Sequence, residues 1–385
     1  MKLLHISDLH LGKRLNEFNL IEDQKYILNE IIKLVQAHKP GAVLICGDVY
    51  DKSQPSAEAV ELLDGFLTDL IAAGQPVFLI SGNHDSPERL GFASRMLAKN
   101  KLFIAGTFSG RLQSYVLQDE YGELAIHLLP FIKPAQVNRF RAEEDKITGY
   151  DEAVRSVLEA SPIDTGKRNI LLAHQFITAG ETEPRRSDSE NISVGGVDNV
   201  DASAFAAFDY VALGHLHGPQ HIGRDTVRYS GSPLKYSFSE VNHNKSVTLV
   251  DLKEKGKIEL EFLHLSPLRE LREIKGPLEA LLQAGRSESE GREDFIRAII
   301  TDEADLYNPL EDLRSVYPNI MALELAKYNK GSNDSSLAGA GGDISHFTPL
   351  ELFRDFYEEM LDQKLEGSSL ELFTEIIEEI GDESK

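Results

Sequence analysis

Side chains that can bind metal ions follow five apolar runs in this sequence, close to the point where each run stops. They are Asp8 and His10, then Asp48, then Asn83 and His84, then His174, and finally His215 and His217. Carboxylate, amide and imidazole ligands without a thiolate suit Mn²⁺, Fe²⁺ or Zn²⁺ better than a closed structural zinc site. With His84 set aside, seven ligands remain, too many for one ion. The pattern therefore predicts two divalent ions, roughly 4 Å apart and bridged by Asp48, which is an arrangement suited to phosphoester hydrolysis.

Each motif taken alone has an ordinary structural explanation. Gly82-Asn83-His84-Asp85 could be a turn with a solvated histidine, and Asp8 with His10 could be a pair at a strand end that faces water. Short motifs of this kind mislead often. The recurrence of ligand-type residues at successive strand ends favours a binding site over a series of unrelated turns.

Two further residues are predicted to take part in the chemistry. His84 is adjacent to the ligand Asn83 and is not needed for coordination, so we expect it to give a proton to the leaving oxygen. Asp51 lies in the same loop as Asp48, and its carboxylate could hold the ring of His84, as carboxylates beside metal sites do.

The elements that must position these residues are apolar strands alternating with amphipathic helices. Predicted strands cover 3–10, 42–46, 77–80, 169–174 and 210–217, and predicted helices cover 25–36, 56–73 and 87–99. In open α/β sheets, binding residues gather beyond the carboxyl ends of the strands. Residues two apart in an extended chain face the same side, so Asp8 should point with His10, and His215 with His217.

Composition is that of a globular protein, with 41% hydrophobic and 27% charged residues. The single cysteine, Cys46, lies in an apolar run, where it is better explained as a packed strand residue than as a nucleophile. The absence of a disulfide framework favours a reducing, cytoplasmic compartment, and no signal-like or membrane-spanning apolar segment is apparent. A net charge of −23 is a mild argument against a nucleic-acid ligand, although bound cations reverse the local sign.

Basic residues nevertheless flank the predicted site. They are Lys13, Arg14, Arg89, Arg185 and Arg186. A basic rim of this kind could contact DNA phosphates. Ordinary solvated surface charges explain the same residues equally well.

The combined motifs resemble the signature of the calcineurin-like metallophosphoesterases. The matching blocks are Asp8-x-His10, Gly47-Asp48-x-x-Asp51, Gly82-Asn83-His84-Asp85, His174 and Gly214-His215-x-His217, and Ile6 to Gly12 and Tyr229-Ser230-Gly231-Ser232-Pro233 resemble the bacterial nucleases of this family. The resemblance implies an α/β fold, a four-layer αββα sandwich in which helices face two mixed sheets. It also implies two ions, with Mn²⁺ as the usual metal, and a non-ligand catalytic histidine at His84. Asp8, His10 and His217 would bind one ion, Asn83, His174 and His215 the other, and Asp48 both.

The same resemblance implies an activity and partners. Members of this branch cleave DNA as 3′–5′ exonucleases on double strands and as endonucleases on single strands and hairpins. They form homodimers through helices that correspond to 56–73 and 87–99 here, and they act with an SMC-like coiled-coil ATPase. Asp51 stands where archaeal and eukaryotic relatives tend to have histidine.

The pattern changes after Pro267. Residues 1–265 are expected to form the catalytic domain, and 266–328 a small α+β capping domain that shapes DNA access. Residues 329–345 are rich in Gly, Ser and Asn and predict a linker, and 346–385 predict a helical hairpin. The apolar faces of the hairpin could dock on the core or bind the ATPase, and the flexible tether before them favours the second. The residues expected to bind it are Leu350, Phe353, Phe356, Tyr357, Phe373 and Ile377.

Two other functions remain compatible with the motifs. A phosphodiesterase or phosphatase for small molecules would need the same metal ligands but neither the cap nor the hairpin. A non-catalytic adaptor is disfavoured, because each of the predicted ligand positions still carries a ligand-type residue.

Overall fold

The computed structural model describes residues 1–180, 182–190, 198–288, 290–304 and 306–326, together with Tyr357 and Leu370. By its internal contacts the chain divides into two units, Met1–Ala326 and Lys327–Lys385. Almost all of the second unit, including the predicted linker and helical hairpin, lies outside the described residues. The same holds for the predicted partner-binding residues Leu350, Phe353, Phe356, Phe373 and Ile377.

Two six-stranded sheets form the body of the first unit. The first has the order β16 (Ile258–His264), β15 (Ser246–Leu252), β1 (Lys2–Ile6), β4 (Ala42–Cys46), β5 (Val77–Ile80) and β6 (Leu102–Ala105). The second has the order β13 (Gln220–Ile222), β14 (Arg224–Tyr229), β12 (Tyr210–Gly214), β9 (Arg168–His174), β8 (Gly122–Leu129) and β7 (Gln113–Asp119). Strands β1, β4, β5 and β6 run parallel, as do β8, β9, β12 and β14, so their carboxyl ends meet at common edges.

The side chains of β4 show why the runs in these strands are continuously apolar. Leu44 and Cys46 belong to the core shared by the two sheets, whereas Val43 and Ile45 belong to the core beneath the outer helices. A strand that is buried on both faces has no polar side to present. Cys46 is therefore the packed strand residue that the sequence predicts, and burial raises the pKa of its thiol well above the usual value.

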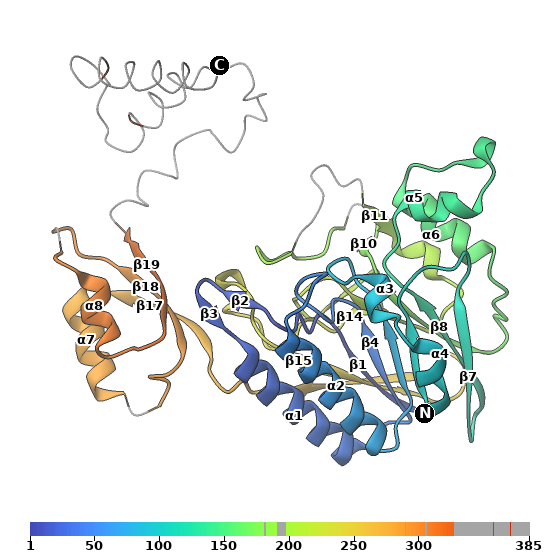
Figure 1. Ribbon diagram of the computed structural model, residues 1–385, viewed down its shortest axis with the longest axis horizontal. Coiled ribbons are helices and arrows are strands. Elements are labelled where there is room, and N and C mark those ends of the chain that lie inside the picture. Colours follow the sequence, from blue (N-terminus) through green and yellow to red (C-terminus); the bar gives the residue numbers. More distant parts are fainter. Residues whose placement is uncertain are drawn as a thin grey trace. The chain divides into compact units, whose positions relative to one another are not determined.

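Helices cover the outer faces of both sheets, which gives the four-layer αββα sandwich expected from the sequence (Figure 1). α1 (Ile21–His38) and α2 (Ala57–Ala72) pack on the first sheet, and α6 (Tyr150–Glu159) packs on the second. Smaller elements complete this part of the chain: β2 (Arg14–Leu15), β3 (Phe18–Asn19), α5 (Pro134–Val137), β10 (Phe176–Thr178) and β11 (Asn199–Asp201). No helix among the described residues is both long enough and apolar enough to cross a bilayer.

The prediction of one continuous helix over 87–99 is wrong. The segment forms two single turns, α3 (Pro87–Leu90) and α4 (Ser94–Leu97), followed by a 3₁₀ turn, η1 (Ala98–Asn100). Ala93 between them has a left-handed backbone, with φ of 59°. Such a residue cannot continue a right-handed helix, so the apolar spacing that predicts one helix is shared between separate turns.

The segment after Pro267 folds in the order strand, helix, strand, helix and strand. β17 (Leu271–Gly276), β18 (Phe295–Ile300) and β19 (Ile320–Leu325) form a parallel sheet, with α7 (Leu278–Ser287) and α8 (Pro309–Arg314) between them in the chain. This sheet and its helices have a hydrophobic core of their own.

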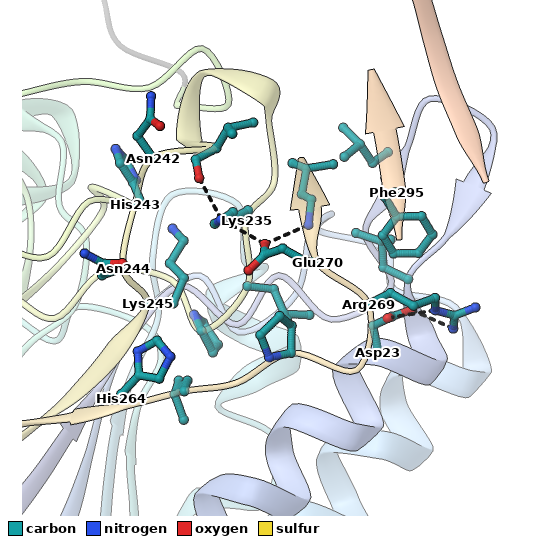
Figure 2. Close-up of a pocket in the computed structure, with 18 residues that line it drawn as sticks. Asp23, Lys235, Asn242, His243, Asn244, Lys245, His264, Arg269, Glu270 and Phe295 are labelled. Carbon is teal, nitrogen blue, oxygen red and sulfur yellow. Dashed lines mark hydrogen bonds and ion pairs between the residues drawn. The ribbon is translucent and has the colours of Figure 1, made fainter. Parts of the chain in front are cut away.

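Polar contacts join this segment to the body of the first unit. Arg269 forms an ion pair of 2.9 Å with Asp23 of α1, and Lys235 forms one of 2.8 Å with Glu270. Both pairs line a cavity of about 310 Å³ at this junction (Figure 2). By contacts, residues 267–326 therefore belong to the same unit as the two large sheets.

Candidate metal centre

The loop after β1 carries the first two predicted ligands. The strand predicted over 3–10 ends at Ile6, and Asp8 and His10 have left-handed backbones with φ of 54° and 43°. Asp and His tolerate this region better than most residues with a Cβ. The main chain pins the loop, because Asp8 N donates to Gly47 O at 3.1 Å and His10 N donates to Asp48 O at 2.9 Å. The two side chains converge through this turn and not through strand alternation.

The two histidines of the loop after β12, His215 and His217, lie in different parts of the site. The strand predicted over 210–217 ends at Gly214, and His215 has φ of 107°. His215 Nδ1 lies 2.9 Å from Asn83 Oδ1, whereas His217 Nε2 lies 3.1 Å from His10 Nε2. The expectation of one shared face for His215 and His217 is therefore wrong, since the bend at His215 separates them.

Groups that could hold a metal ion form three overlapping combinations, of which His10 with Asp48 and His84 is one and the other two are neighbouring clusters without His84. Within each cluster the ligand atoms lie within 4.8 Å of one another, and the clusters are Asp8 with His10 and His217, and Asp48 with His174 and His215. Asn83 joins the second cluster, with Oδ1 3.0 Å from His174 Nε2. Asp48 Oδ2 lies 3.3 Å from His174 Nε2 and 3.7 Å from His10 Nε2, so it stands between the clusters. The structure thus brings together all seven predicted ligands.

The donor atoms fit divalent cations. Asp8 Oδ2 and His10 Nδ1 are buried and have no hydrogen-bond partner among the described residues. Burial raises the pKa of Asp8 to about 6, lowers that of His215 to about 3 and lowers that of His10 well below its usual range. Neutral imidazole is the form that binds metals. A cation at this position would also relieve the cost of burying the Asp8 carboxylate.

Asp48 and His174 influence each other strongly. Burial raises the pKa of Asp48, but the neighbouring His174 outweighs it and holds this pKa well below its usual range. Burial lowers the pKa of His174, but Asp48 outweighs it and brings this pKa to about 9. A positive charge beside Asp48 is therefore strongly favoured, and a bound cation would supply it.

Glycines precede three of the ligands because the backbones approach too closely for a side chain. A Cβ on Gly82 would lie 2.1 Å from Asp48 Oδ1, and one on Gly214 would lie 1.8 Å from Cys46 O. A Cβ on Gly47 would lie 2.3 Å from His174 Nδ1. The Gly-Asp, Gly-Asn and Gly-His dipeptides of the sequence are thus a packing requirement of the site.

Asp85 has a structural role that the sequence reasoning missed. Its buried carboxylate accepts hydrogen bonds from Val49 N at 3.1 Å, Tyr50 N at 2.9 Å and Gly82 N at 2.9 Å. It therefore ties the loop of Asp48 to the loop of Asn83. The feature of the sequence that could have indicated this role is the position of Asp85 directly after His84 in the Gly82–Asp85 motif.

His84 stands beside the clusters and is half-buried. Its ring packs edge-on against His10, with 4.8 Å between ring centroids, and its Nδ1 lies 2.9 Å from the main-chain carbonyl of Asp51. The carboxylate of Asp51 instead pairs with Lys13 Nζ at 2.8 Å. The contact that orients His84 thus comes from the backbone of Asp51 and not, as expected, from its side chain.

The predicted basic residues are placed in different ways. Lys13 is held by Asp51, whereas Arg14 and Arg89 are exposed on β2 and α3. Arg185 and Arg186 are also exposed, and Arg186 lies over the ring of Phe176, with its Cζ 4.5 Å from the centroid. The loop that carries them reaches the metal clusters, because Glu190 Oε1 accepts a hydrogen bond of 2.7 Å from His217 N.

Known families account for most of the chain. The calcineurin-like phosphoesterase family matches residues 1–219, and the family described as type 5 capsule protein repressor C-terminal domain matches residues 267–360. The first match covers more than half of the sequence and contains all the residues of the two clusters. The chain is therefore a calcineurin-like phosphoesterase.

A curated relative narrows the assignment. The D subunit of the nuclease SbcCD from Staphylococcus epidermidis (strain ATCC 12228 / FDA PCI 1200) is 36% identical over 371 residues, which is 95% of each chain. The chain belongs to the SbcD family of nuclease subunits.

Solved structures give a more distant likeness. A dimetal phosphatase from Danio rerio is 12% identical and covers 69% of this chain and 99% of its own, with a TM-score of 0.42. TT1561 of Thermus thermophilus is 15% identical and covers 68% of this chain and 98% of its own, with a TM-score of 0.40. At these scores the likeness adds nothing to the assignment.

Proposed function

We propose that this chain is the nuclease subunit of an SbcCD-type complex and hydrolyses DNA phosphodiesters with two divalent metal ions. The observation that carries the proposal is the convergence of seven ligand-type side chains into two clusters with Asp48 between them. The 36% identity to the D subunit of a nuclease SbcCD, over 95% of both chains, supports DNA as the substrate. We further propose a cytoplasmic location, because the single cysteine is a packed core residue and no disulfide can form within the chain.

The ligand sets follow from the clusters. One ion would be held by Asp8, His10 and His217 and the other by Asn83, His174 and His215, with Asp48 shared. When bound, the two ions would stabilise the charge on the phosphoryl oxygens and help to generate the attacking nucleophile. We propose Mn²⁺, because oxygen and imidazole donors without thiolate suit it.

His84 is proposed to protonate the leaving oxygen. A carbonyl oxygen can only accept, so the contact between His84 Nδ1 and Asp51 O requires a proton on Nδ1. A second proton, on Nε2, is then the one available for transfer. The half-buried ring packs against His10, which places it beside the proposed metal site.

DNA is proposed to follow the exposed cations beside the clusters. Arg185 and Arg186 lie in a loop that is tied to His217 through Glu190, so phosphates bound there would lie near the proposed metal site. Arg14 on β2 and Arg89 on α3 are further exposed cations, and Lys13 is already paired with Asp51. The segment 266–328 is proposed to shape the access of DNA as a cap.

A homodimer through the segments 56–73 and 87–99 is supported by exposed apolar side chains. Phe92 is 81% exposed, Met96 is 71% exposed, and Val60 on α2 is 45% exposed. Large exposed apolar patches mark interaction surfaces. Phe92→Glu with Met96→Glu should convert the dimer to a monomer in light scattering, whereas Val116→Glu, a 61% exposed position on β7, should not.

An SbcC-type ATPase is the proposed partner of residues 346–385. Ending the chain at Ser345 should spare the hydrolysis of small esters and abolish co-purification of the ATPase. Co-purification that survives the truncation would refute this docking site.

The test of the function uses purified chain with Mn²⁺ on linear duplex DNA, single-stranded DNA and bis-p-nitrophenyl phosphate. The expected result is cleavage of both DNA substrates, with exonuclease action from the 3′ ends of duplexes. Hydrolysis of the small ester without cleavage of either DNA would refute the nuclease and favour a small-molecule phosphodiesterase.

A further inference from the structure

Of the two ring nitrogens of His217, Nε2 faces His10, and Nδ1 contacts side chains of two other segments. Its Nδ1 lies 2.7 Å from Ser189 Oγ and 3.2 Å from Glu240 Oε1. The Ser189 hydroxyl lies 2.5 Å from Glu240 Oε1, and a carboxylate can only accept, so Ser189 donates there. Both groups near His217 Nδ1 are therefore available as acceptors, which requires the proton of the imidazole on Nδ1. The lone pair is then left on Nε2, which faces His10 Nε2 at 3.1 Å.

Glu240 is held in place by Lys245. The carboxylate is fully buried, in the 3₁₀ turn η5 (Phe238–Glu240), and Lys245 Nζ donates to Glu240 Oε2 at 2.6 Å. The same ammonium donates to His217 O and to Ser232 Oγ, each at 2.8 Å. Lys245 is itself 4% exposed. The pair thus contacts His217 at its main-chain carbonyl and, through Glu240, at its ring.

His174, one of the two histidines of the other cluster, is oriented differently. His174 Nδ1 lies 2.7 Å from the main-chain carbonyl of Cys46, the last residue of β4 in the other large sheet. His217 lies three residues beyond the end of β12, where the neighbouring strands no longer continue beside it. A side-chain acceptor takes the place of the carbonyl there. This difference allows the orientation of His217 to be tested by substitution.

We propose that Glu240 is a positioning residue that fixes the tautomer and ring of His217 toward the cation held with Asp8 and His10, and that Lys245 fixes Glu240. The proposal rests on the metal site described above as part of the proposed function. It gives a role to Ser232 in the Tyr229–Pro233 motif, because Ser232 accepts one of the three hydrogen bonds of Lys245. Hydrogen-bonded partners of this kind change metal affinity by about 10–100-fold when they are removed.

Two double variants distinguish the effect of the hydrogen-bond acceptor beside His217 from the effect of the charges on Glu240 and Lys245. Glu240→Leu with Lys245→Met removes the acceptor and both charges together, so that no unpaired charge is left buried. Glu240→Gln with Lys245→Met removes both charges but keeps an oxygen acceptor beside His217. The matched control is Glu259→Gln with Lys253→Met, which makes the same chemical change in an exposed ion pair of 2.5 Å beside the turn between β15 and β16.

Each metal-free protein is titrated with Mn²⁺ in a calorimeter. Wild type and control should bind two ions, and the Leu/Met variant should bind one of them about 10–100-fold more weakly while the other is unchanged. The Gln/Met variant should recover most of the loss. Wild-type affinity at both sites in the Leu/Met variant would overturn the role of Glu240, as would an equal loss at both sites. A wild-type protein that binds no Mn²⁺ would instead refute the metal site itself.

A second measurement tests the proposal even if the Leu/Met variant does not fold. Nitrogen-15 NMR of wild-type protein, with His217 assigned from a His217→Gln difference spectrum, reports which ring nitrogen carries the proton. Protonation on Nδ1 supports the proposal. Protonation on Nε2 in the neutral ring would overturn it.

Discussion

The imidazoles of His10 and His217 meet with their Nε2 atoms 3.1 Å apart, although the residues are separated by 207 positions in the chain. One belongs to the loop after β1 in the first sheet and the other to the loop after β12 in the second. Two nitrogens that face each other this closely, beside the buried carboxylate of Asp8, form a ligand set for a cation. The centre is therefore built where the carboxyl ends of strands from the two sheets come together.

Replacing His84 by Gln should separate catalysis from metal binding. The ring lies beside the clusters but is not among the ligands proposed for either ion, so metal content measured by mass spectrometry should stay at the wild-type level. The loss of a positioned proton donor should lower kcat for DNA cleavage by about 10²–10⁴-fold. Loss of metal together with activity would remove His84 from its assigned role.

Gly82→Ala should disrupt the centre through a single added methyl group. Its Cβ would lie 2.1 Å from Asp48 Oδ1 and 2.3 Å from Asp48 N, and the second of these is a backbone atom. We expect unfolding free energy to fall by about 1–3 kcal/mol or more and Mn²⁺ affinity to fall with it. The matched control is Gly65→Ala in α2, where an added Cβ has no atom within 4 Å. That change should be neutral or stabilising by up to about 1 kcal/mol, and a similar outcome for both variants would contradict the packing account.

Metal binding should stabilise the folded protein. The clusters are assembled only in the folded chain, so Mn²⁺ at 100 times its dissociation constant should add about 2.7 kcal/mol for each site. Thermal unfolding followed by circular dichroism should show a rise in Tm with Mn²⁺ and its reversal by EDTA. In Asp48→Asn the rise should be much smaller, because Asp48 stands between both clusters. An equal rise in that variant would speak against a shared aspartate.

Stability should depend on pH through Asp119 at the tip of the β7–β8 hairpin. Burial raises the pKa of Asp119, but hydrogen bonds from Arg168, the N-terminal amine and the backbone of Tyr121 together outweigh it and bring this pKa to about 2. The unfolded value is about 3.9, so the carboxylate contributes stability that is present above about pH 4 and is lost as the pH falls through about 2. The difference in unfolding free energy between wild type and Asp119→Asn, measured in urea, should therefore be constant from about pH 7 to 5 and shrink below about pH 4. A difference that grows toward acid pH would contradict this sign.

The parts of the fold that the sequence predicts best are the buried parallel strands. β4 and β5 match the predicted ranges 42–46 and 77–80 to the residue, because a strand buried on both faces gives a continuous apolar run bounded by polar residues and glycine. The convergence of the proposed metal ligands could be predicted for the same reason. Parallel strands place the loops at their carboxyl ends along one edge of a sheet.

The backbone conformation of the loops that lead from the strand ends to the proposed ligands could not be predicted in the same way. Asp8, His10 and His215 adopt positive φ, and a pattern of residue types does not distinguish such a bend from one more strand residue. Ala93 breaks the predicted helix over 87–99 with its left-handed backbone, although the intrinsic propensity of alanine favours helices. Glu240 and Lys245 were missed because charged residues are normally exposed. Only the fold shows that this pair is buried behind His217.

The most direct test of the central claim is anomalous diffraction from crystals grown with Mn²⁺. Two anomalous peaks roughly 4 Å apart are expected. One peak should lie among Asp8, His10, Asp48 and His217, and the other among Asp48, Asn83, His174 and His215. A single peak, or peaks with no contact to Asp48, would contradict a centre of two ions that share one aspartate.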